Sequence, residues 1–206
     1  MELTPSQHEA LTELINIGYG RAAAALSELT GRRINLDAPK VAIYPIDQIS
    51  RALHSVLSGD VASVHQVFSG PVSGNALLLL DHKAALLLNA LLLNTPVHPR
   101  SFQADEREAL TEVGNIVLNA CLGVFGNLLQ VHVTFSVPRL DIESVDGVMH
   151  SISVGSQELQ YALMVHTHFN VRDSTVRGYL VIILGITSFS RLVEELQNWE
   201  KRQLAS

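Results

Sequence analysis

The strongest constraint in this sequence is an internal repeat with a displacement of 99 residues. The five residues from Glu9 to Glu13 recur unchanged from Glu108 to Glu112. The same displacement carries Asn16-Ile17 onto Asn115-Ile116 and Pro39 onto Pro138. Such self-similarity marks two copies of one structural unit. We therefore expect a single domain over residues 1–206, made of two pseudo-repeats of about 1–99 and 100–206 that join near Val97 to Ser101.

Each copy is predicted to begin with a long helix, the first over about residues 6–29. Thr4-Pro5 is a competing start, because proline is favoured at the first helical position. Gly31 offers a stop, because glycine readily adopts the left-handed conformation that ends many helices.

The segments after each long helix have the patterns of strands, hairpins and shorter helices. The predicted single strands cover 34–43 and 131–137. Two hairpins are predicted, one joining 61–68 to 75–80 and the other joining 159–169 to 176–186. A short helix is predicted over 46–57 in the first half, and closing helices over 83–93 and 189–199. Pro39 and Pro138 lack a backbone donor and fit a strand edge or an interruption. Antiparallel strands with helices between them favour an α+β fold, a pseudo-twofold repeat of long helix, strands and second helix.

Projection at 100° per residue divides each long helix into an apolar face and an opposite face of small and polar residues. The apolar faces are Leu11, Leu14, Ile15, Gly18, Ala22, Ala25 and Leu29 in the first helix, and Leu110, Val113, Val117, Cys121, Val124 and Leu128 in the second. The opposite faces are Glu9, Glu13, Asn16, Gly20, Ala24 and Ser27, and Glu108, Glu112, Asn115, Asn119, Gly123 and Gly126. The apolar faces are the expected core sides, and the small outward residues would let another protein approach closely.

Two pairs, Glu13 with Asn16 and Glu112 with Asn115, are the candidate functional residues. In each pair the side chains are neighbours at i and i+3. An exposed Glu beside an exposed Asn is ordinarily a solvated helix surface, and that alternative stays open for either helix taken alone. Asn is a poor choice for an exposed helix interior, because its side chain competes for backbone hydrogen bonds. Its recurrence beside Glu at the same offset favours a function.

Glu9 and Glu108 share this outward face but are interpreted as structural. Ser6 with Glu9, and Asp105 with Glu108, have the spacing of a capping box at a helix N-terminus. The two glutamates are therefore assigned to helix capping.

Composition excludes several function classes. The net charge of -6, with no Lys/Arg run, provides no basic surface for phosphates, so no nucleic-acid partner is expected. The chain shows no signal-like segment and no apolar run long enough to span a bilayer, so we expect a cytoplasmic protein.

The nine histidines include no HExxH or paired Cys/His spacing, and His166 and His168 are interpreted as ordinary strand residues. Cys121 lies on the predicted core side and is not expected to be a nucleophile.

The Glu-x-x-Asn pairs resemble the motif of the CheC, CheX and FliY family of chemotaxis phosphatases. That motif is Asp/Ser-x-x-x-Glu-x-x-Asn, then 22 residues, then Pro. The matching residues are Glu13, Asn16 and Pro39 in the first copy, and Glu112, Asn115 and Pro138 in the second. The first motif position departs, being Glu9 and Glu108 here, and Ile15 stands where glycine is usual. Two motif copies in one chain resemble CheC, because CheX carries one.

The resemblance implies a hydrolase of two-component signalling that removes the aspartyl phosphate of a CheY-like response regulator. It implies that Asn16 and Asn115 orient the attacking water, while Glu13 and Glu112 contact the regulator's active-site lysine. An aspartyl phosphate is already activated, and Mg²⁺ on the regulator neutralises developing charge, so an aligned water is the missing contribution. The protein needs no cofactor of its own, and the Mg²⁺ is expected on the partner.

A non-catalytic adaptor is the alternative. Such a protein would bind a response regulator, the deamidase CheD or the flagellar switch, as the relatives FliM and FliN do at the switch. CheC proteins often bind CheD, which makes CheD a second expected partner. The switch proteins lack the paired Glu and Asn of the family pattern, so their presence here favours catalysis.

Overall fold

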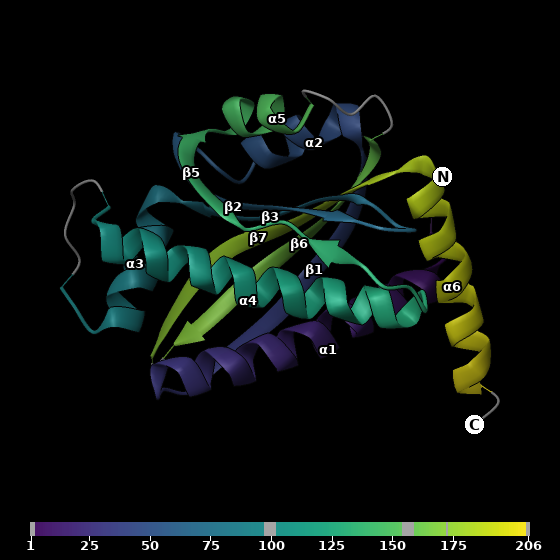
Figure 1. Cartoon of the computed structure of the whole chain (residues 1–206), viewed down its shortest axis with the longest axis horizontal. Helices are drawn as coiled ribbons and strands as arrows, with labels where there is room; N and C mark the ends of the chain where they lie inside the picture. Colours follow the sequence, from purple (N-terminus) through teal and green to yellow (C-terminus); the bar gives the residue numbers. More distant parts are fainter. Residues whose placement is uncertain (1–2, 97–101, 154–158, 172, 205–206) are drawn as a thin grey trace.

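The computed structural model describes residues 3–96, 102–153, 159–171 and 173–204, so the expected junction at Val97 to Ser101 lies outside the described residues. A single twisted antiparallel sheet forms the middle layer (Figure 1). The helices are α1 (Pro5–Thr30), α2 (Ile46–His54), α3 (His82–Leu93), α4 (Ala104–Leu128), α5 (Val145–Ser153) and α6 (Ile186–Leu204). The strands are β1 (Ile34–Pro45), β2 (Asp60–Ser69), β3 (Gly74–Asp81), β4 (Thr134–Phe135), β5 (Arg139–Ser144), β6 (Leu159–Val171) and β7 (Ser174–Gly185). The predicted α+β fold with a pseudo-twofold repeat is confirmed.

The two copies exchange their first strands. The sheet runs in the order β1-β6-β7-β3-β2, and both β4 and β5 pair with β2. Thus β1 of the first copy pairs with β6 of the second, while β5 of the second pairs with β2 of the first. The central neighbours, β3 and β7, also come from different copies. Neither copy completes its sheet without the other.

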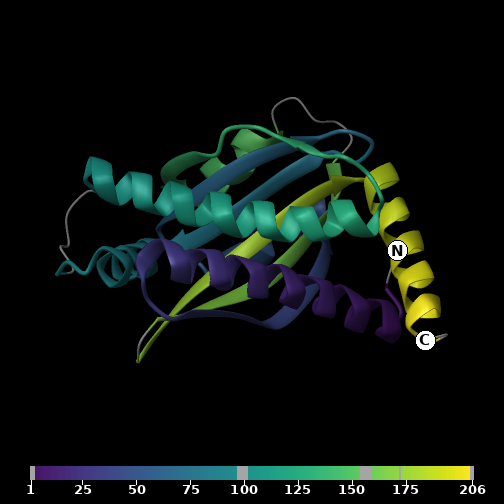
Figure 2. The same ribbon diagram turned by 60° about the horizontal axis from the view of Figure 1, so that its bottom comes forward.

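Helices cover both faces of the sheet, which explains the long apolar runs in the central strands. The long helices α1 and α4 lie side by side on one face and run in opposite directions (Figure 2). The shorter helices α2 and α5 lie on the other face, at the top of Figure 1. Leu78 and Leu80 of β3 belong to the core beneath the long helices, and Leu77 and Leu79 belong to the core beneath the short ones.

Gly18 of α1 packs closely against Cys121 of α4. A Cβ built on Gly18 would lie 3.0 Å from the Cα of Cys121 in α4, so the absence of a side chain sets the helix spacing. The neighbouring Tyr19 is fully buried, and its hydroxyl lies 2.5 Å from Oγ1 of Thr167 in β6. Burial raises the pKa of Tyr19, which keeps the phenol protonated. Helix α1 is thus fixed to both α4 and the sheet.

Most predicted elements are present, and the main errors lie in the second copy. The expected strand 131–137 survives only as β4, and the longer strand β5 begins directly after Pro138. In β1 the pairing with β6 is irregular between Asp37 and Lys40, around Pro39, in agreement with the expected interruption. Helix α5 is missing from the sequence prediction, because Gly147 and the short length of the segment obscure its helical period.

The predicted core faces are correct along most of both long helices and wrong near their C-terminal ends. Ala25 and Leu29 are exposed, and Leu26 is buried instead. Ser27, predicted to face solvent, accepts a hydrogen bond of 2.9 Å from the backbone N–H of Ile34 at the turn into β1. Gly126 is buried because the chain folds back over it, with the N–H of Val131 donating to its carbonyl at 3.0 Å. A helical projection does not show which neighbouring segments of the chain cover the ends of a helix.

Helix α4 is long and apolar enough, by composition alone, to cross a membrane. Its buried residues, including Val117 and Leu122, belong to the core shared with α1 and the sheet. Packing against the core therefore accounts for its apolar character.

Two glycines of α4 provide a matched test of the packing. A Cβ at Gly114 would lie 2.3 Å from Cγ1 of Val64 in β2, whereas a Cβ at Gly123 would meet nothing within 4 Å. We expect Gly114→Ala to lower the free energy of unfolding by about 1–3 kcal/mol through overpacking. Gly123→Ala should raise it by up to about 1 kcal/mol, since alanine favours the helix. Denaturant unfolding of both variants measures the difference, and equal effects would contradict the described packing.

Candidate functional site

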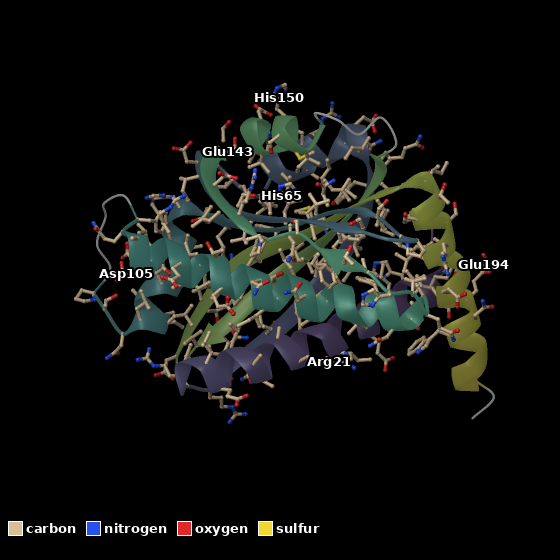
Figure 3. All side chains as sticks on the ribbon, in the orientation of Figure 1. Arg21, His65, Asp105, Glu143, His150 and Glu194 are labelled. Carbon is tan, nitrogen blue, oxygen red and sulfur yellow. The ribbon has the colours of Figure 1, made fainter. Side chains whose placement is uncertain are left out.

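The four candidate residues lie on the outward surfaces of α1 and α4. Glu13 and Asn16 are exposed on α1, Glu112 is exposed on α4, and Asn115 is half-buried. Figure 3 shows the side chains that project from these helices, with Arg21 of α1 and Asp105 at the start of α4 labelled. Each pair stands on a helix surface that a macromolecule could reach, and not at the bottom of a cavity.

In the second copy the candidate residues form a hydrogen-bonded chain. Nδ2 of Asn115 donates to Oε2 of Glu112 over a long contact of 3.4 Å. Nδ2 of Asn119, one turn further along α4, donates to Oδ1 of Asn115 at 2.7 Å. The amide of Asn115 is therefore held from both sides.

The first copy lacks this chain. Gly20 occupies the position equivalent to Asn119, and nothing lies within 4 Å of where its Cβ would be. Among the described residues, no side-chain hydrogen bond involves Glu13 or Asn16. The Glu and Asn pair is therefore held by side-chain hydrogen bonds in the second copy, whereas the described residues hold it by none in the first.

The first turns of α1 and α4, which precede the candidate pairs, are anchored to the sheet in the same way in both copies. The Nε2 atom of His8 lies 2.8 Å from the carbonyl oxygen of Val41 in β1. The guanidinium of Arg107 donates to the carbonyl of Leu140 in β5 at 2.9 Å. His8 and Arg107 are 99 residues apart, as are Val41 and Leu140. Different side chains therefore make an equivalent contact in the two copies.

Sequence reasoning missed these anchors, because His8 and Arg107 are not identical. The available signal is the spacing itself, since each acceptor lies two residues after the repeated prolines Pro39 and Pro138. Proline cannot donate to a sheet ladder, so strand pairing is interrupted next to the carbonyl that receives the anchor. This placement explains structurally why proline recurs at the same position in both copies.

The assignment of Glu9 and Glu108 to helix capping is wrong. The first capping box is formed by Thr4 and Gln7, with the N–H of Thr4 donating to Oε1 of Gln7 at 2.9 Å. The second begins at Gln103, whose N–H donates to Oε2 of Glu106 at 2.8 Å. Pro5 at the first helical position moves the start of α1 before Ser6, and α4 begins before Asp105.

Glu9 and Glu108 are consequently exposed carboxylates on the same helix surface as the candidate pairs. Glu9 precedes Glu13 by one helical turn, and Glu108 stands in the same relation to Glu112. They occupy the first position of the motif that the sequence resembles. Each copy therefore presents two carboxylates and one amide along two turns of helix.

Other candidate chemistry is accounted for by structural contacts. Cys121 is buried as expected, and burial raises the pKa of its thiol far from the range of a nucleophile. His168 Nδ1 lies 3.3 Å from Oδ2 of Asp37, and the ring of His166 packs edge-on against Tyr179. Desolvation, with Lys40 nearby, lowers the pKa of His166. Within the described residues no three His, Cys, Asp or Glu side chains gather to hold a metal ion.

Comparisons with known proteins place this fold. No protein-family model matches the chain. The chain is 24% identical over 195 residues to the CheY-P phosphatase CheC of Bacillus subtilis, covering 90% of this chain and 91% of that protein. The crystal structure of Thermotoga maritima FliY matches with a TM-score of 0.74 and 18% identity, covering 96% of this chain and 99% of the crystallised FliY chain.

A third likeness is to a protein of the flagellar switch. The FliM middle domain of H. pylori matches with a TM-score of 0.68 and 13% identity, covering 94% of this chain and 99% of that domain. The architecture is therefore a CheC-like α+β fold. The resemblance to the CheC, CheX and FliY family is confirmed.

The capping assignment has a direct test in two substitutions on α1. Thr4→Ala should lower the free energy of unfolding by about 1 kcal/mol, because it removes the side-chain acceptor for the N–H of Gln7. Glu9→Ala should change it by no more than about 0.5 kcal/mol, as is usual for a surface substitution. Thermal or urea unfolding distinguishes them, and a larger loss in Glu9→Ala would restore the capping role.

Proposed function

We propose that this chain hydrolyses the aspartyl phosphate of a CheY-like response regulator. The observation that carries the proposal is the duplicated pair, Glu13 with Asn16 and Glu112 with Asn115, on the outward surfaces of two adjacent helices. The likeness to a CheY-P phosphatase over most of both chains supports the same function. A site on a helix surface suits a substrate that is itself a folded protein, since the phosphoryl group is brought to it by docking.

In the proposed reaction Asn16 or Asn115 enters the regulator's active site and orients a water toward phosphorus. A carboxamide both accepts and donates hydrogen bonds without adding charge beside the phosphoryl group. The water attacks phosphorus, the bond to the aspartyl oxygen breaks, and the products are inorganic phosphate and the free aspartate. Alignment of the reacting atoms is the main contribution required, because the regulator supplies Mg²⁺ and an activated phosphoryl group.

Glu13 and Glu112 are proposed to contact the lysine of the regulator's active site. Each stands one turn from its Asn, so one docking event can place both side chains. Glu9 and Glu108 extend the acidic surface by a further turn, which would strengthen the attraction to a basic group at the rim of the partner. The proposal places the protein in the cytoplasm, where response regulators act.

An adaptor without catalysis is the second candidate, favoured by the likeness to FliM, since the fold alone is shared with a switch protein. Such an adaptor would bind a response regulator, CheD or the flagellar switch. The two candidates differ in one observable. The enzyme shortens the lifetime of the phosphorylated regulator at substoichiometric concentration, whereas an adaptor binds without changing it.

The test uses a CheY-like regulator from the same organism, phosphorylated with acetyl phosphate in the presence of Mg²⁺. We expect the protein to accelerate loss of phosphate, and Asn16→Ala with Asn115→Ala to return the rate to that of the regulator alone. Asn127→Ala, at an exposed position near the end of α4, is the matched control and should keep the wild-type rate. Circular dichroism and the unfolding temperature of the double variant should be unchanged.

A wild-type rate in the folded double variant would exclude these residues from catalysis. Tight binding of the regulator with no change in its dephosphorylation rate would establish the adaptor.

A further inference from the structure

The two copies of the candidate site differ in one residue that contacts the Asn side chain. Asn119 donates to Oδ1 of Asn115 at 2.7 Å, and Gly20 stands at the equivalent place in α1. The Oδ1 atom of Asn119 is buried and has no hydrogen-bond partner among the described residues. A buried acceptor without a partner destabilises the fold, and Asn is unfavourable within a helix. Stability therefore does not explain why Asn occupies this position.

The carboxylate of Glu112 sets the direction of the hydrogen-bonded chain. A carboxylate can only accept, so the amide of Asn115 must turn its Nδ2 toward Glu112. This orientation leaves Oδ1 of Asn115 facing Asn119, which must then present its own Nδ2. One orientation of the Asn115 amide is thereby selected, although an unrestrained amide could flip.

The held amide keeps capacity for further hydrogen bonds. Its oxygen has a second lone pair, and its nitrogen has a second hydrogen. Both are free to bind a water, so Asn119 restrains Asn115 without occupying all of its hydrogen-bonding sites. The exposed Asn16 has no such neighbour, so its side chain must be ordered within the bound complex, in the step that aligns the water.

We infer that Asn119 is a positioning residue for Asn115, and that the Glu112 and Asn115 copy is the faster of the two. This inference rests on the proposed phosphatase function. The free energy of ordering one side chain corresponds to about 2- to 10-fold in rate or affinity. Because Asn119 acts through Asn115 in the reacting complex, its effect should fall mainly on kcat and little on KM.

The first experiment isolates the second copy with Asn16→Ala and measures steady-state dephosphorylation of the phosphorylated regulator. Adding Asn119→Ala should lower kcat by about 2- to 10-fold, the range of the ordering effect. Asn119→Asp keeps the shape of the side chain but presents only acceptors to Oδ1 of Asn115, so it should lower kcat at least as much. A residue that served only to fill space would leave Asn119→Asp active.

The reciprocal experiment installs the contact in the first copy. In an Asn115→Ala background, Gly20→Asn should raise kcat above that of Gly20→Ala, which adds a helix-favouring side chain without an amide. The open space around Gly20 can accept either residue. A gain of activity cannot arise from misfolding, so this arm keeps the inference falsifiable if Asn119 variants are unstable.

The outcomes separate the inference from the proposed function. An active wild type whose Asn16→Ala variant is slower than its Asn115→Ala variant overturns the ranking of the copies. The positioning role is overturned if kcat of the Asn119→Asp variant equals that of the parent protein that keeps Asn119. It is also overturned if kcat of the Gly20→Asn variant is no higher than that of the Gly20→Ala variant. A wild type that does not accelerate dephosphorylation overturns the proposed function and this inference together.

Discussion

The exchange of first strands between the two copies is the constraint on which the rest of the structure depends. Since β1 pairs with β6 and β5 pairs with β2, each long helix lies over strands from both copies. Strands β3 and β7 pair at the centre and bury side chains on both faces. The two candidate sites are therefore parts of one cooperative fold, and a destabilising substitution in the core of either copy should destabilise both sites.

Given this arrangement, the close contact between Gly18 and Cys121 brings the two long helices together on one face of the sheet. A close helix crossing turns the apolar sides of α1 and α4 inward together and leaves the Glu and Asn pairs facing out. The anchors from His8 to Val41 and from Arg107 to Leu140 fix the turn beside each pair. What differs between the copies is local, and it lies in the side chains around each Asn.

The repeat and the helical period predicted much of this structure because they report on backbone pattern and burial. They place Glu13, Asn16 and Glu112 on the exposed side, and Cys121 in the core. They did not predict the strand exchange, because a repeat with strong internal similarity does not say which copy supplies a strand's neighbour. The true caps were missed because Thr4 with Gln7, and Gln103 with Glu106, compete with nearby pairs of the same spacing. The contact of Asn119 with Asn115 depends on side-chain conformation, which spacing alone does not determine.

The central claim is that two separate copies of one Glu and Asn pair act on the phosphorylated regulator. The most direct measurement compares single-turnover rates of phosphate loss for the wild type, Asn16→Ala and Asn115→Ala with protein in excess of the regulator and below saturation. The account predicts that the accelerations of the two single variants add up to that of the wild type, because each retains one independent copy. Complete loss of activity in both single variants would contradict it, since the two residues would then belong to one composite site.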